Sequence, residues 1–362
     1  MLPAHRPDGY AYPLTHYNNY VIFKQSFQHL IAHQNLYEYW LNEHWDLFKY
    51  SPSFALMMAP FYALPDWLGL FLWNLLNALV LFLAIKKLPG FSELQKVLVL
   101  LFCLIELITS MQNAQSNALM AGLLILAFTS FESGKPIWAV MLILISAFIK
   151  IFGLAGFLLC LFYPQKPKMV MWGSIFAVLF FLLPVPVVGF QQLIWQYQNW
   201  GVMLANDHAA SVGLSVQGIL TSWFGLTQTK GIVLLTGLAG LLIPYLYLKK
   251  YAIFDFRLLS LASLLVWLVI FNHKAESPTF IIALVGVALW YFYSDRTALH
   301  TTLAVLVFVF TSLAVTDISP SFFRNTYVYA YSIKALPCIL VWCLLVWELI
   351  TLRKTKIKSD IP

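Results

Sequence analysis

Long apolar segments separated by short polar turns run from residue 66 to the end of the chain. A helix of about 20 apolar residues crosses a bilayer. The pattern therefore predicts an all-α fold, a polytopic transmembrane bundle of about 10 or 11 apolar helices over 66–352. The predicted helical segments are 66–85, 95–112, 118–131, 137–163, 169–188, 231–248, 258–271, 278–293, 298–316 and 331–352.

The apolar run 137–163 is interrupted by Lys150 and has a basic turn at each end. Since both ends then face one side of the membrane, the run is predicted to form two short helices with Lys150 at the bend. A lysine at the bilayer centre costs about 2.5–3.5 kcal/mol on insertion scales. Its ammonium must meet a polar cavity, an anion or an acid. We expect an anionic ligand, and pairing with Glu106 is the structural alternative.

Fourteen of the 22 Lys and Arg residues fall at alternate ends of the apolar segments. Basic residues mark cytoplasmic loops, so the tail 353–362 is predicted inside. Residues 1–65 are then an outer loop, in which the short apolar piece 52–63 is a re-entrant or interfacial helix. A loop near 189–230 and an aromatic loop at 317–330 are expected on the same outer face. The whole chain is interpreted as a single membrane domain.

Composition excludes a water-soluble globular protein, because 61% of the residues are hydrophobic and only 10% are charged, against roughly 25% charged in soluble domains. The net charge of +7 fits attraction to anionic lipid headgroups and not nucleic acid. The four cysteines lie in apolar segments, where they are expected to be small core residues. No phosphate-binding glycine loop, dinucleotide fingerprint or zinc spacing is recognisable, so no cofactor and no metal are expected.

The predicted outer face gathers the residues that can carry chemistry. His273, Lys274 and Glu276 share one turn, where a lysine and a histidine can hold a phosphate and a nearby acid can orient them or take a proton. An ordinary charged loop is the alternative. Aromatic and acidic residues are dense in 17–50 and near Asp207 and His208, a composition that suits sugar faces and lipid headgroups equally.

Several short motifs, in their order along the chain, resemble a known family. They are Asn19-Tyr20-Val21-Ile22-Phe23, Asn35-Leu36-Tyr37, Phe48-Lys49-Tyr50-Ser51-Pro52, Gln115-Ser116-Asn117-Ala118 and the segment around Lys150. They are similar to glycosyltransferase family 87, whose members are GT-C-type polytopic enzymes similar to bacterial polyprenyl-phosphate-mannose-dependent α-mannosyltransferases. The resemblance covers nearly the whole chain.

The resemblance implies a reaction at the outer face of the bacterial inner membrane, with the active site towards the periplasm or exterior. An acceptor hydroxyl attacks the anomeric carbon of a polyprenyl-phosphate sugar with inversion, and a carboxylate takes the proton. The donor is a polyprenyl-phosphate hexose, mannose by default. The acceptor is a lipid-linked or cell-surface glycan.

By the same resemblance, His273, Lys274 and Lys150 contact the donor phosphate and stabilise the charge that develops on it. No metal is required if these cations supply the charge. The remaining residues assigned to substrate binding are Glu276, Asp207, His208, Gln115, Asn117 and Tyr50.

The chain departs from the family at the position of the proposed catalytic base. The family motif begins with an aspartate, and this chain has Asn19, whose amide cannot accept a proton. Asp46 and Glu38 are the first substitutes, followed by Glu43 and Asp207; otherwise this subgroup differs in mechanism or activity. The family also has a spanning helix before this loop, so a truncated or misassigned start at Met1 would explain its absence here.

Two other functions compete with glycosyl transfer. A transporter or flippase would bind a lipid phosphate in the same cationic cavity without making bonds, but no internal repeat typical of such proteins is recognisable. A lipid-linked glycan polymerase or ligase would need arginines for a diphosphate, and the predicted outer loops that follow the first apolar segment contain only Arg324.

Overall fold

The computed structural model describes residues 2–5, 11–14, 17–206 and 212–352. Apart from a short antiparallel hairpin of β1 (Leu2–His5) and β2 (Ala11–Leu14), these residues form helices and connecting turns. The predicted all-α, polytopic helical fold is confirmed. Contacts divide the chain into an N-terminal unit, Met1–Leu158 with Gln165–Ser211, and a C-terminal unit, Leu159–Pro164 with Val212–Pro362. That the whole chain acts as a single enzyme domain stays a prediction.

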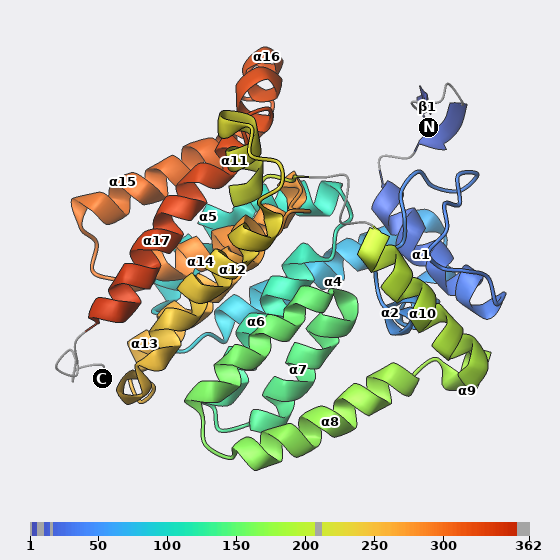
Figure 1. Ribbon diagram of the computed structural model, residues 1–362, viewed down its shortest axis with the longest axis horizontal. Helices are drawn as coiled ribbons and strands as arrows, with labels where there is room; N and C mark the ends of the chain where they lie inside the picture. The colour runs from blue at the N-terminus through green and yellow to red at the C-terminus, as the bar shows by residue number, and fades with distance from the viewer. Residues whose placement is uncertain (1, 6–10, 15–16, 207–211, 353–362) are drawn as a thin grey trace. The chain divides into compact units, whose positions relative to one another are not determined.

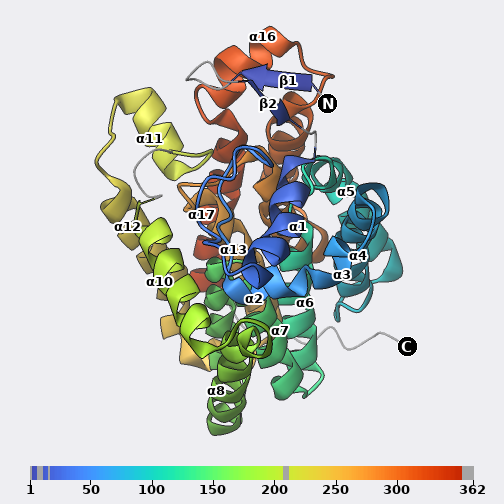
Figure 2. The same cartoon turned by 90° about the vertical axis from the view of Figure 1, so that its right-hand side faces the viewer.

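The N-terminal unit is built around α6, which packs against α4 on one side and α7 on another (Figure 1). Most of α6 is buried, because its residues are apolar around the whole helix. Figure 2 shows α1, α2 and α10 on the side of this unit that faces the viewer, where α2 contacts both α1 and α10. Its helices are α1 (Asn18–Ile31), α2 (Pro52–Met57), α3 (Ala59–Tyr62), α4 (Asp66–Lys86), α5 (Glu93–Gln112), α6 (Asn117–Glu132), α7 (Pro136–Ile149), α8 (Lys166–Leu182), α9 (Val185–Val188) and α10 (Phe190–Asn206).

The C-terminal unit has its core at the pair α13 (Phe254–Ile270) and α14 (Phe280–Tyr293), against which α17 (Leu336–Thr351) packs. Gly286 permits the close approach of the pair, since a Cβ there would lie 2.6 Å from the carbonyl oxygen of Ala262. The other elements are α11 (Val216–Phe224), α12 (Lys230–Leu242), η2 (Ile243–Leu246), η3 (Leu248–Lys250), η4 (Ser277–Thr279), α15 (Ala298–Leu306), η5 (Val307–Ser312), η6 (Leu313–Val315), α16 (Ser321–Phe323), η7 (Arg324–Tyr329) and η8 (Ile333–Ala335).

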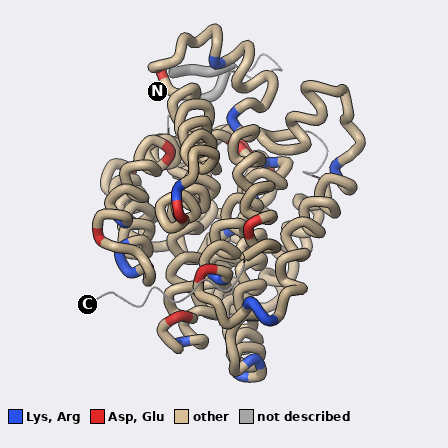
Figure 3. The backbone as a smooth tube through the Cα atoms, turned by 90° about the vertical axis from the view of Figure 1, so that its left-hand side faces the viewer, with Lys and Arg blue, Asp and Glu red and all other residues tan. Residues whose placement is uncertain are grey.

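Within the described residues, five helical segments are long and apolar enough to cross a membrane. Charged residues are sparse along the backbone (Figure 3), as expected for a multi-pass membrane protein. Shorter apolar helices, such as α6 and α7, add to these five. The long segments are Asp66–Lys86, Glu93–Gln112, Lys166–Val188, Ala298–Val315 and Ile333–Thr351.

The prediction of a loop over 189–230 is wrong, because α10 and α11 occupy most of it. Helix α10 buries Leu193, Gln196 and Met203, which recur at helical spacing among its other polar and aromatic residues. The abundance of polar and aromatic residues concealed this period. The aromatic loop expected at 317–330 likewise contains α16 and η7. The helical piece expected at 52–63 is present as α2 and α3.

Gln196 joins α10 to the segment that follows α1. Its side chain is fully buried, its Nε2 donates to the carbonyl of Gln34 at 2.6 Å, and its Oε1 accepts from the amide of Leu36 at 3.2 Å. One side chain therefore satisfies two backbone groups of the segment, which carries no regular structure of its own.

We expect Gln196→Leu to destabilise this junction, because each backbone group left unsatisfied in a buried site costs about 1–3 kcal/mol. Hydrogen exchange measured on the purified protein should show faster exchange at the Leu36 amide and a lower unfolding temperature. The matched control is Gln198→Leu, whose side chain is exposed on the same helix. Equal exchange rates of the Leu36 amide in the two variants would contradict the stabilising role assigned to the Gln196 side chain.

Candidate functional site

The candidate residues fall into two groups, one in each unit, and each group is described by itself. The N-terminal unit carries Asn19, Glu38, Asp46, Tyr50, Gln115, Asn117 and Lys150. The C-terminal unit carries His273, Lys274 and Glu276. Asp207 and His208 lie outside the described residues.

Lys150 lies at a break in the backbone, as the sequence predicts. Helix α7 ends at Ile149, Lys150 is extended with φ −136° and ψ 123°, and the 3-10 helix η1 (Ile151–Phe162) follows. Its ammonium donates to Oδ1 of Asn117 at 2.6 Å and approaches Oε1 of Gln115 at 3.4 Å. Gln115, Asn117 and Lys150 are predicted from the sequence to share a substrate site, and the structure brings these three side chains together.

The turn that presents the two amide oxygens is held by buried side chains of α4. Ala114 adopts a positive φ of 50°, and the indole N–H of Trp73 donates to its carbonyl at 2.9 Å. Oδ1 of Asn77 accepts from the amide of Leu119 at 3.1 Å. Because Trp73 and Asn77 are almost fully buried, the turn and therefore the amide oxygens that contact Lys150 are fixed.

Aromatic rings lie next to the same ammonium. Its Nζ is 5.7 Å from the ring centre of Tyr50 and 5.8 Å from that of Phe152. Tyr50 is buried against Phe23, with ring centres 4.8 Å apart, and its carbonyl accepts from the hydroxyl of Tyr37 at 2.9 Å. A fixed cation beside aromatic faces and amide groups can bind an anion or the polar and apolar faces of a sugar.

Ser51 links the irregular segment that carries Tyr50 to the end of α7. Its hydroxyl donates to the carbonyl of Phe148 at 2.5 Å and accepts from the amide of Phe54 at 3.1 Å, which caps α2. The segment at Tyr50 and the break at Lys150 are therefore positioned by one side chain.

The three candidates for the catalytic position have different environments. Asn19 donates through Nδ2 to the carbonyl of Asn113 at 2.9 Å, which gives it a structural contact. Glu38 is exposed and accepts from Nδ2 of Asn35 at 2.9 Å. Asp46 has a side chain 31% exposed and lies 3.3 Å from the ammonium of Lys49. Asp46 is thus the partly sheltered carboxylate of this set.

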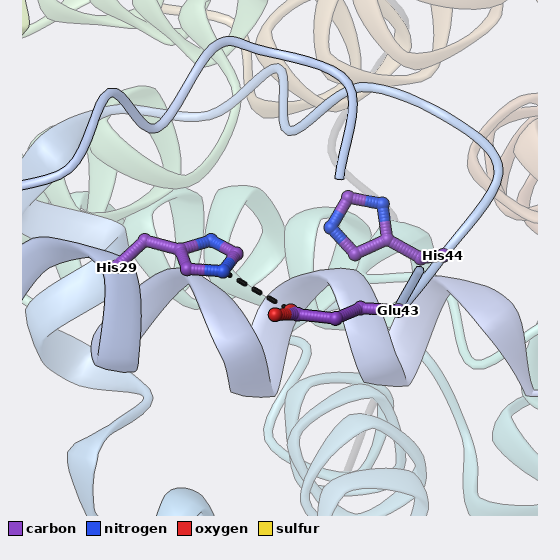
Figure 4. A group of neighbouring side chains, drawn as sticks. All are labelled: His29, Glu43 and His44. Carbon is purple, nitrogen blue, oxygen red and sulfur yellow. Dashed lines mark ion pairs between the residues drawn. The ribbon is translucent and has the colours of Figure 1, made fainter. Parts of the chain in front are cut away.

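Sequence reasoning missed a cluster of His29, Glu43 and His44 (Figure 4). Nε2 of His29 lies 3.1 Å from the Glu43 carboxylate, and the indole of Trp40 stacks on the His29 ring at 4.1 Å. Burial lowers the pKa of His29, opposed by the nearby charge of Glu43, and burial also lowers the pKa of His44. Both imidazoles are therefore favoured in their neutral form. The sequence signal was weak, because His29 and the pair Glu43-His44 lie in different elements.

In the C-terminal unit, His273 and Lys274 are partly exposed and Glu276 is exposed. The turn that carries them is fixed through its backbone. The amide of Lys274 donates to Oδ1 of Asn272 at 2.9 Å, and the amide of Leu214 donates to the carbonyl of Ala275 at 2.8 Å. The three ionisable side chains therefore project from a turn whose main chain is tied to the segment before α11.

Lys334 is a second residue that sequence reasoning missed. Its side chain is fully buried, its ammonium donates to the hydroxyl of Ser277 at 2.8 Å, and it lies 5.0 Å from the ring centre of Phe280. This adds a buried cation to the same turn. The available signal was the same as for Lys150, a lone lysine at the edge of an apolar segment.

Gly213 packs directly on this turn with φ +53°, and a Cβ there would lie 2.7 Å from the carbonyl oxygen of His273. We expect Gly213→Ala to displace the turn, in addition to the strain of about 1–2 kcal/mol that a side chain adds at positive φ. Gly225→Ala is the matched control, since Gly225 has φ +68° with open space around it. The unfolding temperature in detergent should fall more for Gly213→Ala. The same decrease in both variants would show that the close contact has no effect.

Comparison with curated proteins gives no match to the chain. A family model described as glycosyltransferase family 87 matches residues 48–270, which is more than half of the sequence. The matched part includes Tyr50, Gln115, Asn117 and Lys150, whereas Asp46 and His273 lie just outside it. The resemblance noted in the sequence is thereby confirmed at the level of the family, and the chain belongs to glycosyltransferase family 87.

Proposed function

We propose that this membrane glycosyltransferase moves a hexose, with mannose as the default, from a polyprenyl-phosphate sugar to a lipid-linked or cell-surface glycan. Family membership supports glycosyl transfer in a membrane. The donor class is supported by one observation above the others. The ammonium of Lys150 is held by Asn117 and Gln115 at a break between two apolar helical segments.

The Lys150 ammonium suits a leaving group that is a lipid phosphate. As the glycosidic bond breaks, negative charge grows on the phosphate oxygen, and a cation already fixed in place stabilises it without reorganisation. A lysine also pairs well with phosphate as a compact point charge. The neighbouring amides and the ring of Tyr50 are suited to the sugar hydroxyls and the face of the sugar.

His273 and Lys274 are proposed as further cations for an anionic substrate group, with Glu276 as an orienting acid. The buried ammonium of Lys334, on η8, supports this proposal, because it donates to the hydroxyl of Ser277 next to this turn. A histidine and two lysines at one turn favour a phosphate over a neutral sugar. No metal is needed for this chemistry when fixed cations supply the positive charge.

The proton from the acceptor hydroxyl needs a carboxylate, because the amide of Asn19 cannot take it. We assign this role to Asp46 first and to Glu38 second. Asp46 is favoured by its partial burial next to Lys49. In this scheme, the acceptor oxygen attacks the anomeric carbon, its proton goes to the carboxylate, and the phosphate leaves with the bonding electron pair, with inversion at the sugar.

The reaction is proposed at the outer face of the bacterial inner membrane. Support comes from the alternation of basic turns along the chain, which orients the 17–50 segment and the 272–277 turn away from the cytoplasm. The donor lipid and the acceptor would then meet at the periplasmic or exterior side.

The proposal is tested with purified protein in liposomes that contain radiolabelled polyprenyl-phosphate mannose and candidate acceptors. The expected result is labelled product together with free polyprenyl phosphate. Movement of intact donor between leaflets without any cleavage would instead identify a transporter or flippase and would refute the proposed transfer.

Lys150→Ala and His273→Ala are each expected to reduce transfer at least about 100-fold, because each removes a group that stabilises developing charge. Membrane insertion should be unchanged. The controls are Lys135→Ala, an exposed lysine at the other end of α7, and His33→Asn, an exposed histidine. Full transfer activity in both Lys150→Ala and His273→Ala would refute the proposal that these side chains bind the donor phosphate.

Asp46→Asn is expected to lower kcat by about 100- to 10,000-fold, the usual contribution of a general base, with little change in the KM for the donor. Glu38→Gln should have a smaller effect. Initial rates of transfer at saturating donor concentration compare the kcat values of the Asp46→Asn and Glu38→Gln variants. If amide replacements at Glu38, Glu43, Asp46 and Asp207 all keep the original rate, a different group accepts the proton.

A further inference from the structure

The cluster of His29, Glu43 and His44 has the composition and spacing of a metal site. Within the described residues, it is the group of three such side chains whose potential ligand atoms lie within 4.8 Å of one another. His29 comes from the buried face of α1, whereas Glu43 and His44 come from the turn that follows Trp40. The fold thus joins ligands that are separated along the chain.

Nε2 of His29 is buried and faces the Glu43 carboxylate, whose nearest oxygen is 3.1 Å away. The side chain of His29 is only 3% exposed. When Nε2 carries no proton, it faces a carboxylate that can only accept hydrogen bonds, so both groups then need a cation or a donor. A metal ion bound to Nε2 would satisfy its lone pair and would also use the carboxylate beside it.

The ring of His44 is already oriented as a ligand. Its Nδ1 lies 2.8 Å from the carbonyl oxygen of Asp46, to which it can donate a proton. That bond places the proton on Nδ1 and leaves the lone pair on Nε2, which faces the space shared with His29 and Glu43 (Figure 4). A carbonyl bound to the second nitrogen of a ligating histidine is the common outer contact in metal sites.

We infer that Nε2 of His29, the carboxylate of Glu43 and Nε2 of His44 bind one divalent transition-metal ion of the zinc class. Two imidazoles and one carboxylate form a known ligand set for Zn²⁺ with a fourth position open. Glu43, whose side chain is 36% exposed, lies at the accessible side of the cluster. Binding draws the three ligand atoms together and replaces the contact between His29 and Glu43 with a bond from each side chain to the metal.

The bound ion would fasten the turn 40–46 to α1. The same turn carries Asp46, whose carbonyl contacts His44, so the metal acts as a positioning element for the segment between α1 and Tyr50. Its binding does not depend on the proposed glycosyl transfer. A metal measurement therefore succeeds or fails separately from the activity assay.

The test uses the full chain, purified without a histidine tag, stripped with a chelator and dialysed against Zn²⁺. Elemental analysis should give a single equivalent of zinc for the native chain, and Co²⁺ in its place should produce the visible absorption of a low-coordinate site. Hydrogen exchange over residues 40–46 should slow when the metal is added.

Glu43→Gln and His44→Gln should lose the zinc and the cobalt spectrum, whereas His33→Asn should keep both. Glu43→Gln is the decisive variant, because its partly exposed side chain can change without a cavity in the core. His33 serves as the control because it is an exposed histidine of the same segment. A native chain that retains no zinc, or a Glu43→Gln variant that binds as much as the native chain, overturns the inference.

Discussion

A lysine ammonium within an apolar helical run must be met by polar atoms, and this requirement organises the N-terminal unit around Lys150. The ammonium needs the amide oxygens of Asn117 and Gln115. Those oxygens need a fixed turn between α5 and α6, which Trp73 and Asn77 provide from α4. The helix breaks between α7 and η1 at Lys150 itself, whose extended backbone joins the two segments. The cost of placing a charge there supports the proposal that this site binds an anion.

The C-terminal unit repeats this arrangement with different elements. Lys334 is fully buried and bonded to Ser277, next to the turn that carries His273 and Lys274. The main chain of the turn is held by Leu214 and Asn272. In both units a lysine ammonium thus donates to polar side chains at a fixed turn, which favours the preorganised stabilisation of negative charge.

The sequence predicted those parts of the molecule in which a single local signal dominates. The apolar runs of α4, α5 and α6 gave helices close to their observed bounds, and Lys150 marked its own bend. The prediction of secondary structure from the sequence was wrong where polar and aromatic residues interrupt the helical pattern of apolar positions. In α10, the Trp, Gln and Asn residues concealed the helical spacing of Leu193, Gln196 and Met203. The contact of His29 with Glu43 depends on how the chain after α1 folds back, which no local pattern specifies. Lys334 carried the same signal as Lys150 and was overlooked.

The central claim is that the fixed ammonium of Lys150 binds the phosphate of a lipid-linked donor. Its most direct test is a binding titration of the purified chain with a short-chain polyprenyl phosphate, in which Lys150→Met is compared with Lys135→Met. The account predicts that Lys150→Met weakens binding at least about tenfold, equivalent to about 1.4 kcal/mol, while Lys135→Met binds like the native chain. Equal affinities for all three proteins would contradict it.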